Sequence, residues 1–172
     1  MTPIAQTPHL LLRHWQEADL DAFCRLTSDP LVMHWVGDGT VLDRDITARW
    51  IAKSQQNYLQ RGYGVWAVQD RLSEEVIGWA GITQTEHSEE GRSAELVYAL
   101  RPDYWGKGHA SELVLQITGW TWRHTALDSI VATIDPANTP SQRVLEKNGF
   151  AVEADRLDED GLPVRYCRLY RS

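Results

Sequence analysis

The chain has 172 residues, of which 42% are hydrophobic and 24% are charged. This length favours a single domain, and this composition can fill and cover one core, which excludes a chain that is mainly disordered. The balance of 17 basic and 24 acidic residues gives a formal net charge of −7. Each phosphate contact usually needs a Lys or Arg, so this charge argues against nucleic acid as a partner and favours an amine-bearing one.

The sequence gives no signal for a metal, a membrane or export. Cys24 and Cys167 stand far apart, and the histidines show no metal-ligand spacing, so we expect no metal. No segment approaches the roughly 20 apolar residues of a membrane span, and the first residues lack a basic segment followed by an apolar run. We therefore expect a cytoplasmic protein that does not act at a membrane.

The first hundred residues predict two helices and four strands. Residues 1–9 have little pattern and are interpreted as an N-terminal extension, so the single domain is expected to span residues 10–172. Apolar periodicity and turn residues at the boundaries define the elements. They are a strand at 10–13, helices at 16–27 and 43–61, and strands at 63–69, 76–85 and 92–100. Short links between the last three strands favour an antiparallel meander.

The rest of the chain alternates helices and strands. The predicted elements are a helix after Gly108, a strand at 129–135, a helix between 139 and 149, and strands at 150–153 and 164–170. Thr139 is expected to cap the second of these helices, with Pro140 at its first position, and Gly149 to end it. The paired terminal strands could also mediate a homodimer.

A glycine-rich turn is the sharpest motif in the chain. It reads Trp105-Gly106-Lys107-Gly108-His109-Ala110-Ser111 and leads from a strand into a helix. Such a turn points unpaired backbone N–H groups at one spot, where the helix dipole adds partial positive charge. Glycine also lets a ligand approach the amides and allows positive φ. This pattern predicts a pyrophosphate site, against the alternative of a plain helix start.

Two cofactor classes fit a phosphate loop of this kind. The spacing Gly106-x-Gly108-x-x-Ser111 is close to a dinucleotide fingerprint, and Asp135 ends the next strand where a ribose-binding acid could lie. However, too few residues follow Asp135 for a second mononucleotide-binding half. The preceding meander also differs from an opening parallel βαβ unit, so we disfavour a dinucleotide.

Two segments together resemble the GNAT acetyltransferases, and within them the branch that acetylates N-terminal amines of ribosomal proteins. The segment 105–110 is similar to their pyrophosphate loop, with Trp105 at a position that is usually Gln or Arg. The segment from Asn138 to Phe150 is similar to their second signature, beside the pantetheine. The resemblance runs from about Leu10 to Tyr170. It implies an α+β fold with a mostly antiparallel, splayed central sheet and helices on both faces.

The resemblance also implies acetyl-CoA as cosubstrate, lying in the gap of the splayed sheet. Strand backbone groups would pair with the pantetheine amides, as in β-augmentation. Turn amides would hold the pyrophosphate, Lys107 would offset charge, and Asn138 would reach the pantetheine or the leaving thiol. The implied cofactor-binding residues are Val97, Ala99, Leu100, Trp105, Gly106, Lys107, Gly108, His109, Ala110, Ser111, Asn138 and Ser141.

Two side chains are candidates for catalysis. Glu95 shares a strand face with Val97 and is a candidate general base, against the alternative of a structural salt bridge. A backbone N–H near Val97 or Tyr98 could stabilise the oxyanion. Many members carry a thiolate-protonating tyrosine where this chain has Leu145, so Ser141 is the candidate that hydrogen-bonds the leaving sulfur, against an ordinary first-turn serine.

The resemblance places the acceptor pocket at the loop that carries His34 and Trp35, although an aromatic loop also suits a core. The implied activity is transfer of an acetyl group from acetyl-CoA to a primary amine, either a protein N-terminus or a small molecule. A non-catalytic acyl-CoA-binding sensor is the alternative, since the usual tyrosine is missing. The acceptor itself stays open.

Overall fold

The computed structural model describes residues 3–172 of the chain. Its strands are β1 (Ala5–Gln6), β2 (Leu10–Arg13), β3 (Val65–Asp70), β4 (Val76–Thr83), β5 (Ser93–Leu100), β6 (Ser129–Ile134), β7 (Ala151–Leu157) and β8 (Pro163–Tyr170). They form one sheet in the order β1-β2-β3-β4-β5-β6-β8-β7. All neighbours are antiparallel except β5 and β6, which run parallel.

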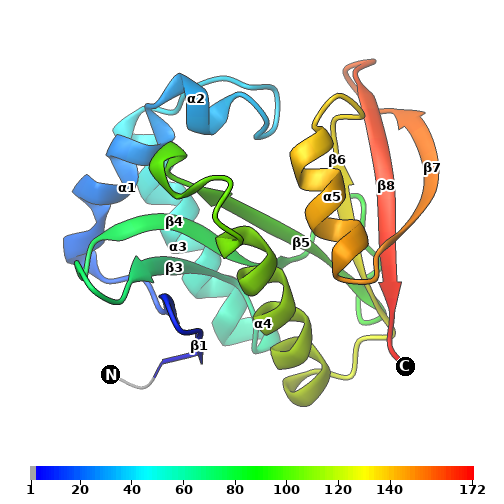
Figure 1. Ribbon diagram of the computed structural model, residues 1–172, viewed down its shortest axis with the longest axis horizontal. Helices are drawn as coiled ribbons and strands as arrows, with labels where there is room; N and C mark the ends of the chain where they lie inside the picture. Colours follow the sequence, from blue (N-terminus) through cyan, green and yellow to red (C-terminus); the bar gives the residue numbers. More distant parts are fainter. Residues whose placement is uncertain (1–2) are drawn as a thin grey trace.

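Helices cover both faces of this sheet (Figure 1). They are α1 (Leu20–Thr27), α2 (Pro30–Met33), α3 (Arg44–Arg61), α4 (His109–His124) and α5 (Thr139–Lys147), with 3₁₀ turns at Glu17–Asp19 and Pro102–Tyr104. Successive residues of a strand face opposite sides, so Trp66 of β3 packs with α4 and α5, while Ala67 packs with α1 and α2. The predicted α+β fold is confirmed. No helix within residues 3–172 has both the length and the apolar character that crossing a membrane requires.

The sheet opens between its two parallel strands. β5 stays in register with β4 as far as Leu100, which lies opposite Gly78. Its pairing with β6 ends at Glu95, which lies opposite Val131, although β6 continues to Ile134 alongside β8. The edge of β5 after Glu95 therefore has no strand partner, and Figure 1 shows the two strands diverging.

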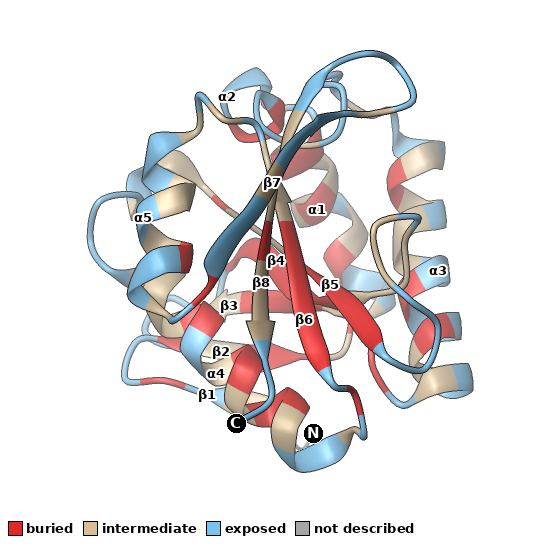
Figure 2. Cartoon of the chain, turned by 90° about the vertical axis from the view of Figure 1, so that its right-hand side faces the viewer, coloured by how far each residue is buried: buried red, intermediate tan, exposed pale blue. Residues whose placement is uncertain are grey.

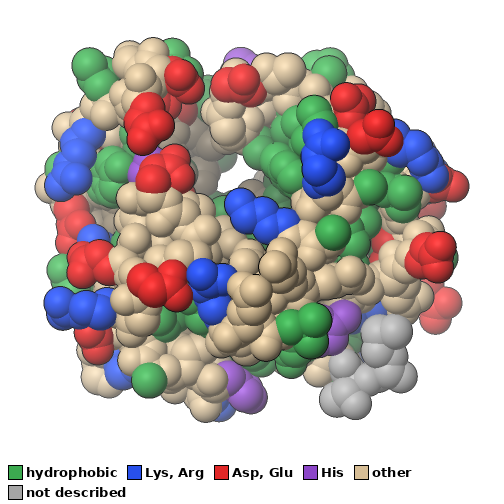
Figure 3. Space-filling view, turned by 180° about the vertical axis from the view of Figure 1, so that it is seen from behind, with side chains coloured by type: hydrophobic (Ala, Val, Ile, Leu, Met, Phe, Trp, Pro, Cys, Tyr) green, Lys and Arg blue, Asp and Glu red, His purple; other side chains and the backbone are tan. Residues whose placement is uncertain are grey.

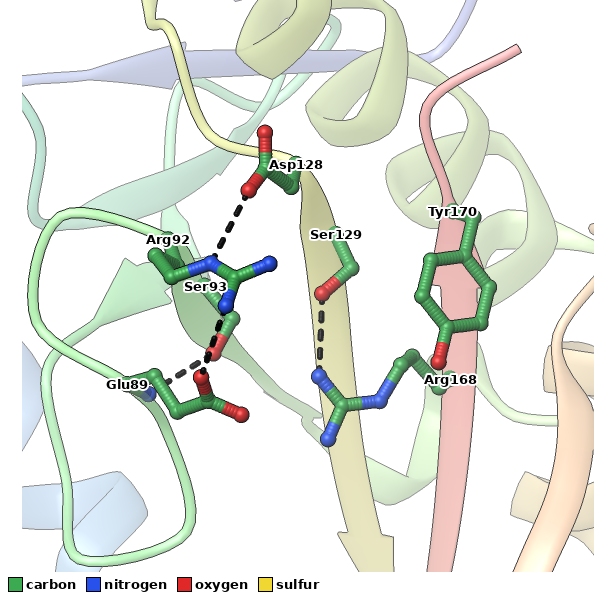
Figure 4. Close-up of a pocket in the computed structure, with 7 residues that line it drawn as sticks. All are labelled: Glu89, Arg92, Ser93, Asp128, Ser129, Arg168 and Tyr170. Carbon is green, nitrogen blue, oxygen red and sulfur yellow. Dashed lines mark hydrogen bonds and ion pairs between the residues drawn. The ribbon is translucent and has the colours of Figure 1, made fainter.

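Polar contacts hold the two strands together at the other end. Arg92, just before β5, forms an ion pair with Asp128, just before β6, at 3.2 Å, and its main-chain carbonyl accepts a bond from the Asp128 N–H at 2.7 Å. On the far side of β6, Arg168 of β8 donates to the Ser129 hydroxyl at 3.0 Å. Figure 4 shows these side chains around a shallow crevice. One end of the β5–β6 pair is thus fixed while the other is open.

The boundaries of the long third helix agree with the sequence prediction. The Asp43 side chain accepts a hydrogen bond from the Ile46 N–H at 2.8 Å, and Gly62 follows the last turn with a φ of 77°. The predicted N-cap of α5, Thr139, is wrong by one residue. The N-cap is Asn138, whose side-chain oxygen accepts a hydrogen bond from the Ser141 N–H at 3.2 Å.

Two short elements escaped the sequence analysis. Residues 30–33 form α2, whose N-cap Asp29 accepts a bond from the Leu31 N–H at 2.9 Å. Within the expected N-terminal extension, Ala5–Gln6 forms β1, which pairs with β2 at the edge of the sheet. Elements of two or four residues are too short to show a periodic pattern. The division of the chain at residue 10 stays a prediction.

β4 and β5 approach each other closely because β4 carries a glycine opposite the end of β5. A Cβ atom built on Gly78 would lie 2.2 Å from the Ala99 carbonyl oxygen and 2.9 Å from a methyl group of Leu100. These contacts are shorter than van der Waals separation, and the nearest is to backbone that cannot move aside alone. Gly78 therefore allows the tight seam that supports the open edge of β5.

We expect Gly78→Ala to lower the free energy of unfolding by about 2–3 kcal/mol, because overpacking must displace β5. The matched control is Gly119→Ala in α4, where the new Cβ would lie 3.4 Å from the mobile Arg123 side chain. This control should raise stability by roughly 0.5–1 kcal/mol through helix propensity. Urea unfolding of both variants measures the difference, and equal stabilities would contradict the tight seam.

Candidate active site

A cavity opens where β5 and β6 separate. Its volume is about 610 Å³, and its walls are the loop after α2, β5, the glycine-rich turn with the start of α4, the end of β6 and the first turns of α5. Figure 3, which views the molecule from behind, shows a deep hollow with both basic and acidic side chains around its opening. A cavity of this size, with an unpaired strand edge along one wall, is suited to a ligand that carries its own hydrogen-bonding groups.

The glycine-rich turn leads directly into the first turn of α4. Gly106 and Gly108 have φ values of 71° and 85°, in the left-handed region that favours glycine. Gly108 is the N-cap of α4 and supplies no side chain, so no side-chain bond closes this helix end. The N–H groups of its first turn have no partners within the helix, and the positive end of the helix dipole lies here. The turn can therefore bind an anion, as the sequence predicts.

Most of the predicted turn residues lie on the cavity wall. Those that line it are Trp105, Gly106, Gly108, His109, Ala110 and Ser111. Lys107 does not line it, because its Nζ atom turns back and donates to the Asp103 carbonyl at 2.7 Å. Lys107 therefore acts on a bound anion only through its long-range charge in this arrangement.

Trp105 fastens the turn to the end of β5. Its indole Nε1 donates a hydrogen bond to the Leu100 carbonyl at 2.7 Å. The Leu100 carbonyl is thus already engaged, whereas Val97 and Ala99 line the cavity on the free part of the strand. The residue that departs from the family's usual Gln or Arg therefore connects the anion-binding turn to the strand that faces the opening.

A buried phenol lies beside the predicted catalytic serine. The Tyr98 hydroxyl of β5 and the Ser141 hydroxyl of α5 are 2.6 Å apart, and both residues line the cavity. Burial raises the pKa of Tyr98 to about 12, although the hydrogen bond with Ser141 opposes the shift. The phenol therefore stays protonated at neutral pH. The Asn138 side-chain oxygen accepts a hydrogen bond from the Ser141 backbone N–H, so Asn138 holds the main chain of the residue whose hydroxyl meets Tyr98.

Glu95 is buried, with 6% of its surface exposed, at the point where β5 and β6 part. One carboxylate oxygen accepts a bond from the Thr85 hydroxyl and the other from the Thr133 hydroxyl of β6. Glu95 also lines the cavity, as does Thr133. Glu95 forms no salt bridge within residues 3–172, so the salt bridge considered as the alternative to a catalytic role is not present. The structural role left for Glu95 is to connect the strands through its hydrogen bonds to Thr85 and Thr133. The two hydroxyls leave lone pairs of the carboxylate for a further donor.

The loop after α2 brings only one of its two predicted residues to the cavity. Trp35 lines the wall together with Val36 and Gly37, and 41% of Trp35 is exposed. His34 is not part of the lining and packs against Trp35 with ring centroids 4.3 Å apart. His34 is exposed beside the indole, and its role in acceptor binding stays a prediction.

Sequence reasoning missed Tyr98 as a side chain of the site. In the strand pattern Tyr98 lies on the face opposite Glu95, so alternation places the two side chains apart. Leu145, which is fully buried in the core, stands where many family members have a tyrosine. This absence was the one sequence signal that another element brings a tyrosine to the site. Because the strands separate, both faces of β5 contribute to the cavity, and this could not be read from alternation alone.

These features fit the acetyl-CoA that the resemblance implies. The uncapped start of α4 supplies donors for a diphosphate, and the free edge of β5 supplies donors and acceptors for an arm that contains amides. Ser141 and Glu95 then lie on the walls of the cavity into which such an arm would lead.

Comparisons with known proteins agree with this geometry. An N-acetyltransferase of Bacillus licheniformis named p20, itself uncharacterized, is 31% identical over 164 residues, which cover 95% of this chain and 91% of the relative. A GNAT-family acetyltransferase structure from Bacillus anthracis superposes with a TM-score of 0.82 at 24% identity, covering 96% of both chains. RimL, a ribosomal L7/L12 alpha-N-protein acetyltransferase solved with coenzyme A, also gives 0.82, at 17% identity and 98% coverage of both chains.

The acetyltransferase (GNAT) domain family matches residues 9–151, which include the glycine-rich turn, β5, β6 and α5. The match therefore spans every element that builds the cavity. The similarity to RimL at this identity shows a shared fold, whereas the family match and p20 concern the sequence itself. The chain belongs to the GNAT acetyltransferase family.

Proposed function

We propose that the protein transfers an acetyl group from acetyl-CoA to a primary amine. The observation that carries the proposal is the meeting of two unsatisfied backbone surfaces in one cavity, the uncapped start of α4 and the free edge of β5. The N-acetyltransferase name of the p20 relative and the coenzyme A in the RimL structure support it. The alternative, an acyl-CoA-binding module without turnover, shares the donor site and differs in releasing no thiol.

Acetyl-CoA supplies the activated acetyl group when it is bound, and the chain positions it. The amides around Gly106–Ser111 would bind the diphosphate, while the β5 backbone around Val97 and Ala99 would pair with the amides of the arm. A backbone N–H near Val97 or Tyr98 would stabilise negative charge that develops on the acetyl oxygen.

Glu95 is our proposed acceptor for the proton of the amine, directly or through a water. An α-amino group with a pKa near 8 costs only about 1.4 kcal/mol to present in its neutral form at pH 7, whereas a lysine amine costs about 4.6 kcal/mol. A buried carboxylate held by two hydroxyls can attract the ammonium form and then take its proton. The lower cost of the neutral α-amino group supports a protein N-terminus over a lysine side chain as the proposed acceptor.

Ser141 is our proposed hydrogen-bond donor to the leaving sulfur, and Tyr98 orients it. Transfer of the Tyr98 proton to a thiolate of pKa about 8.5 would be uphill by roughly 3.5 pKa units, or about 5 kcal/mol. Tyr98 is therefore unsuited as the proton source. When the Tyr98 hydroxyl donates to Ser141, the proton of Ser141 is free to point into the cavity.

The acceptor class follows from charge and from the relatives. The net charge of −7 favours a cationic acceptor. The ribosomal-protein specificity in the name of RimL supports an N-terminal amine. We place the activity in the cytoplasm, where Cys24 and Cys167 would remain the free thiols that the structure has. A homodimer through the exposed edge of β7 stays a prediction.

We expect the purified protein to release coenzyme A from acetyl-CoA only when a peptide with a free N-terminus is present, with a matching mass gain on the peptide. The same peptide with a blocked N-terminus should give no release. Gly108→Asp should weaken donor binding roughly tenfold or more, because its carboxylate would face the diphosphate at short range.

The control for that variant is Gly161→Asp, which introduces the same residue at a similar φ of 78° in the β7–β8 turn, far along the chain from the cavity. It should keep donor affinity and turnover. Equal affinity of both variants for acetyl-CoA would contradict the assignment of the glycine-rich turn as the diphosphate site. Binding of acetyl-CoA without release of coenzyme A for any amine would favour the alternative, an acyl-CoA-binding module without turnover.

We expect Ser141→Ala to lower kcat about 10- to 100-fold with little change in the KM for acetyl-CoA, since the bond forms only as the sulfur leaves. Tyr98→Phe should lower kcat less, by about 3- to 10-fold, because Ser141 keeps its own proton and loses only its orientation. Since the pKa of Tyr98 is about 12, wild-type activity should show no loss from this phenol up to pH 10. A larger defect in Tyr98→Phe than in Ser141→Ala would reverse these roles.

We expect Glu95→Gln to lower kcat/KM for a peptide N-terminus by about 100-fold at pH 7. The defect should shrink by up to about tenfold at pH 9, because above its pKa near 8 the amine is already neutral and no ammonium proton has to be removed before the attack. Glu159→Gln, which changes an exposed carboxylate in the turn between β7 and β8, is the control and should leave the rate unchanged. A defect that is equal at both pH values, with lower stability, would make Glu95 a brace only.

A further inference from the structure

A second cluster of reactive side chains lies where the N-terminal segment meets α4, and it shares only His109 with the wall of the cavity. It contains His9, which lies between β1 and β2, and His109 and Glu112 of the first turn of α4. One ligand atom from each lies within 4.8 Å of the others. His9 Nδ1 and Glu112 Oε1 are 2.9 Å apart, and the rings of His9 and His109 are 5.1 Å apart between centroids. Residues 100 positions apart in sequence thus converge on one point.

Two atoms of this cluster are buried without a hydrogen-bond partner. They are His109 Nδ1 and Glu112 Oε2, and among residues 3–172 only one other side-chain atom, Trp66 Nε1, is in the same condition. Buried polar atoms nearly always have a partner in the protein or an ion or water, so each exception needs a physical reason. Here the two exceptions belong to neighbouring residues and lie at the same cluster of ligand-type side chains.

The donor set identifies the kind of ion. Two imidazoles and one carboxylate are ligands of zinc and similar transition ions, whereas magnesium and calcium take oxygen ligands almost alone. Ligand atoms at about 2.1 Å from a tetrahedral ion lie roughly 3.4 Å apart. The candidate ligand atoms lie within 4.8 Å of one another, so the widest gap must close by at most about 1.4 Å, while the 2.9 Å between His9 and Glu112 must open slightly. The His9 side chain can make this movement, because it is 58% exposed. Its backbone is held by bonds between His9 N–H and Thr7 Oγ1 and between Arg71 N–H and the His9 carbonyl.

We propose that His9, His109 and Glu112 form a binding site for a divalent transition ion of the zinc type, with water at the open fourth position. The ion would replace the hydrogen bond between His9 and Glu112 and would engage the unpartnered atoms. It would connect the N-terminal segment to the first turn of α4, directly after the glycine-rich turn. This site was not visible in the sequence, because no ligand spacing joins His9 to the helix. The proposal does not rest on the proposed acetyl transfer.

Calorimetric titration of chelator-treated full-length protein with zinc chloride at pH 7.5 tests the site. We expect one ion per chain. His9→Ala and Glu112→Gln should each weaken binding by at least about tenfold, since even the loss of an outer partner of a metal ligand costs 10- to 100-fold. In wild-type protein, zinc at about 100 times its Kd should raise Tm by roughly 5–10 °C, and this rise should be absent in His9→Ala.

His124→Ala removes an imidazole from the far end of the same helix and is the control, which should bind zinc like the wild type. The Tm values without zinc show whether each variant is folded, and His9→Ala should match the wild type because the side chain is exposed. Failure of the wild type to bind one equivalent would overturn the proposal. Binding that His9→Ala and Glu112→Gln leave intact would do the same, and would point to other ligands such as the free thiols.

Discussion

The structure depends on the early separation of two parallel strands. β5 and β6 pair over only three residues each, and polar contacts between Arg92 and Asp128 fix that paired end. Past Glu95 the edge of β5 that faces β6 has no strand partner, so its backbone groups are left to bond with a ligand or with water in the open cavity. The cavity, the uncapped start of α4 and the catalytic candidates all lie around this unpaired edge of β5. The site is therefore a consequence of incomplete pairing.

Long elements with clear boundaries could be predicted from the sequence. The helix from Arg44 to Arg61 has an aspartate cap before it and a glycine after it, and both act as the sequence indicates. The glycine-rich turn was equally readable, because positive φ and an uncapped helix start depend on local residues. In contrast, the cap of α5 moved to Asn138, since both Asn138 and Thr139 are capping residues and only the three-dimensional path decides between them.

The parts of the site that sequence could not supply are contacts between distant segments. The hydroxyls of Tyr98 and Ser141 meet across the opening of the sheet. The Glu95 carboxylate accepts hydrogen bonds from the hydroxyls of Thr85 and Thr133. Alternation along β5 assigns each side chain to one face, but it carries no information about where a neighbouring strand leaves. Once β6 departs, residues of both faces can reach the same cavity.

The bond between the Trp105 indole and the Leu100 carbonyl has a mechanical meaning. It ties the glycine-rich turn to the end of β5, and so it helps to fix the distance between the turn and the point where β5 and β6 separate. A donor whose head group and reactive end are separated by another length would place its acyl carbon before or beyond the serine. Selectivity for the carrier would then be set by distance along the wall, independently of which amine arrives from the other side.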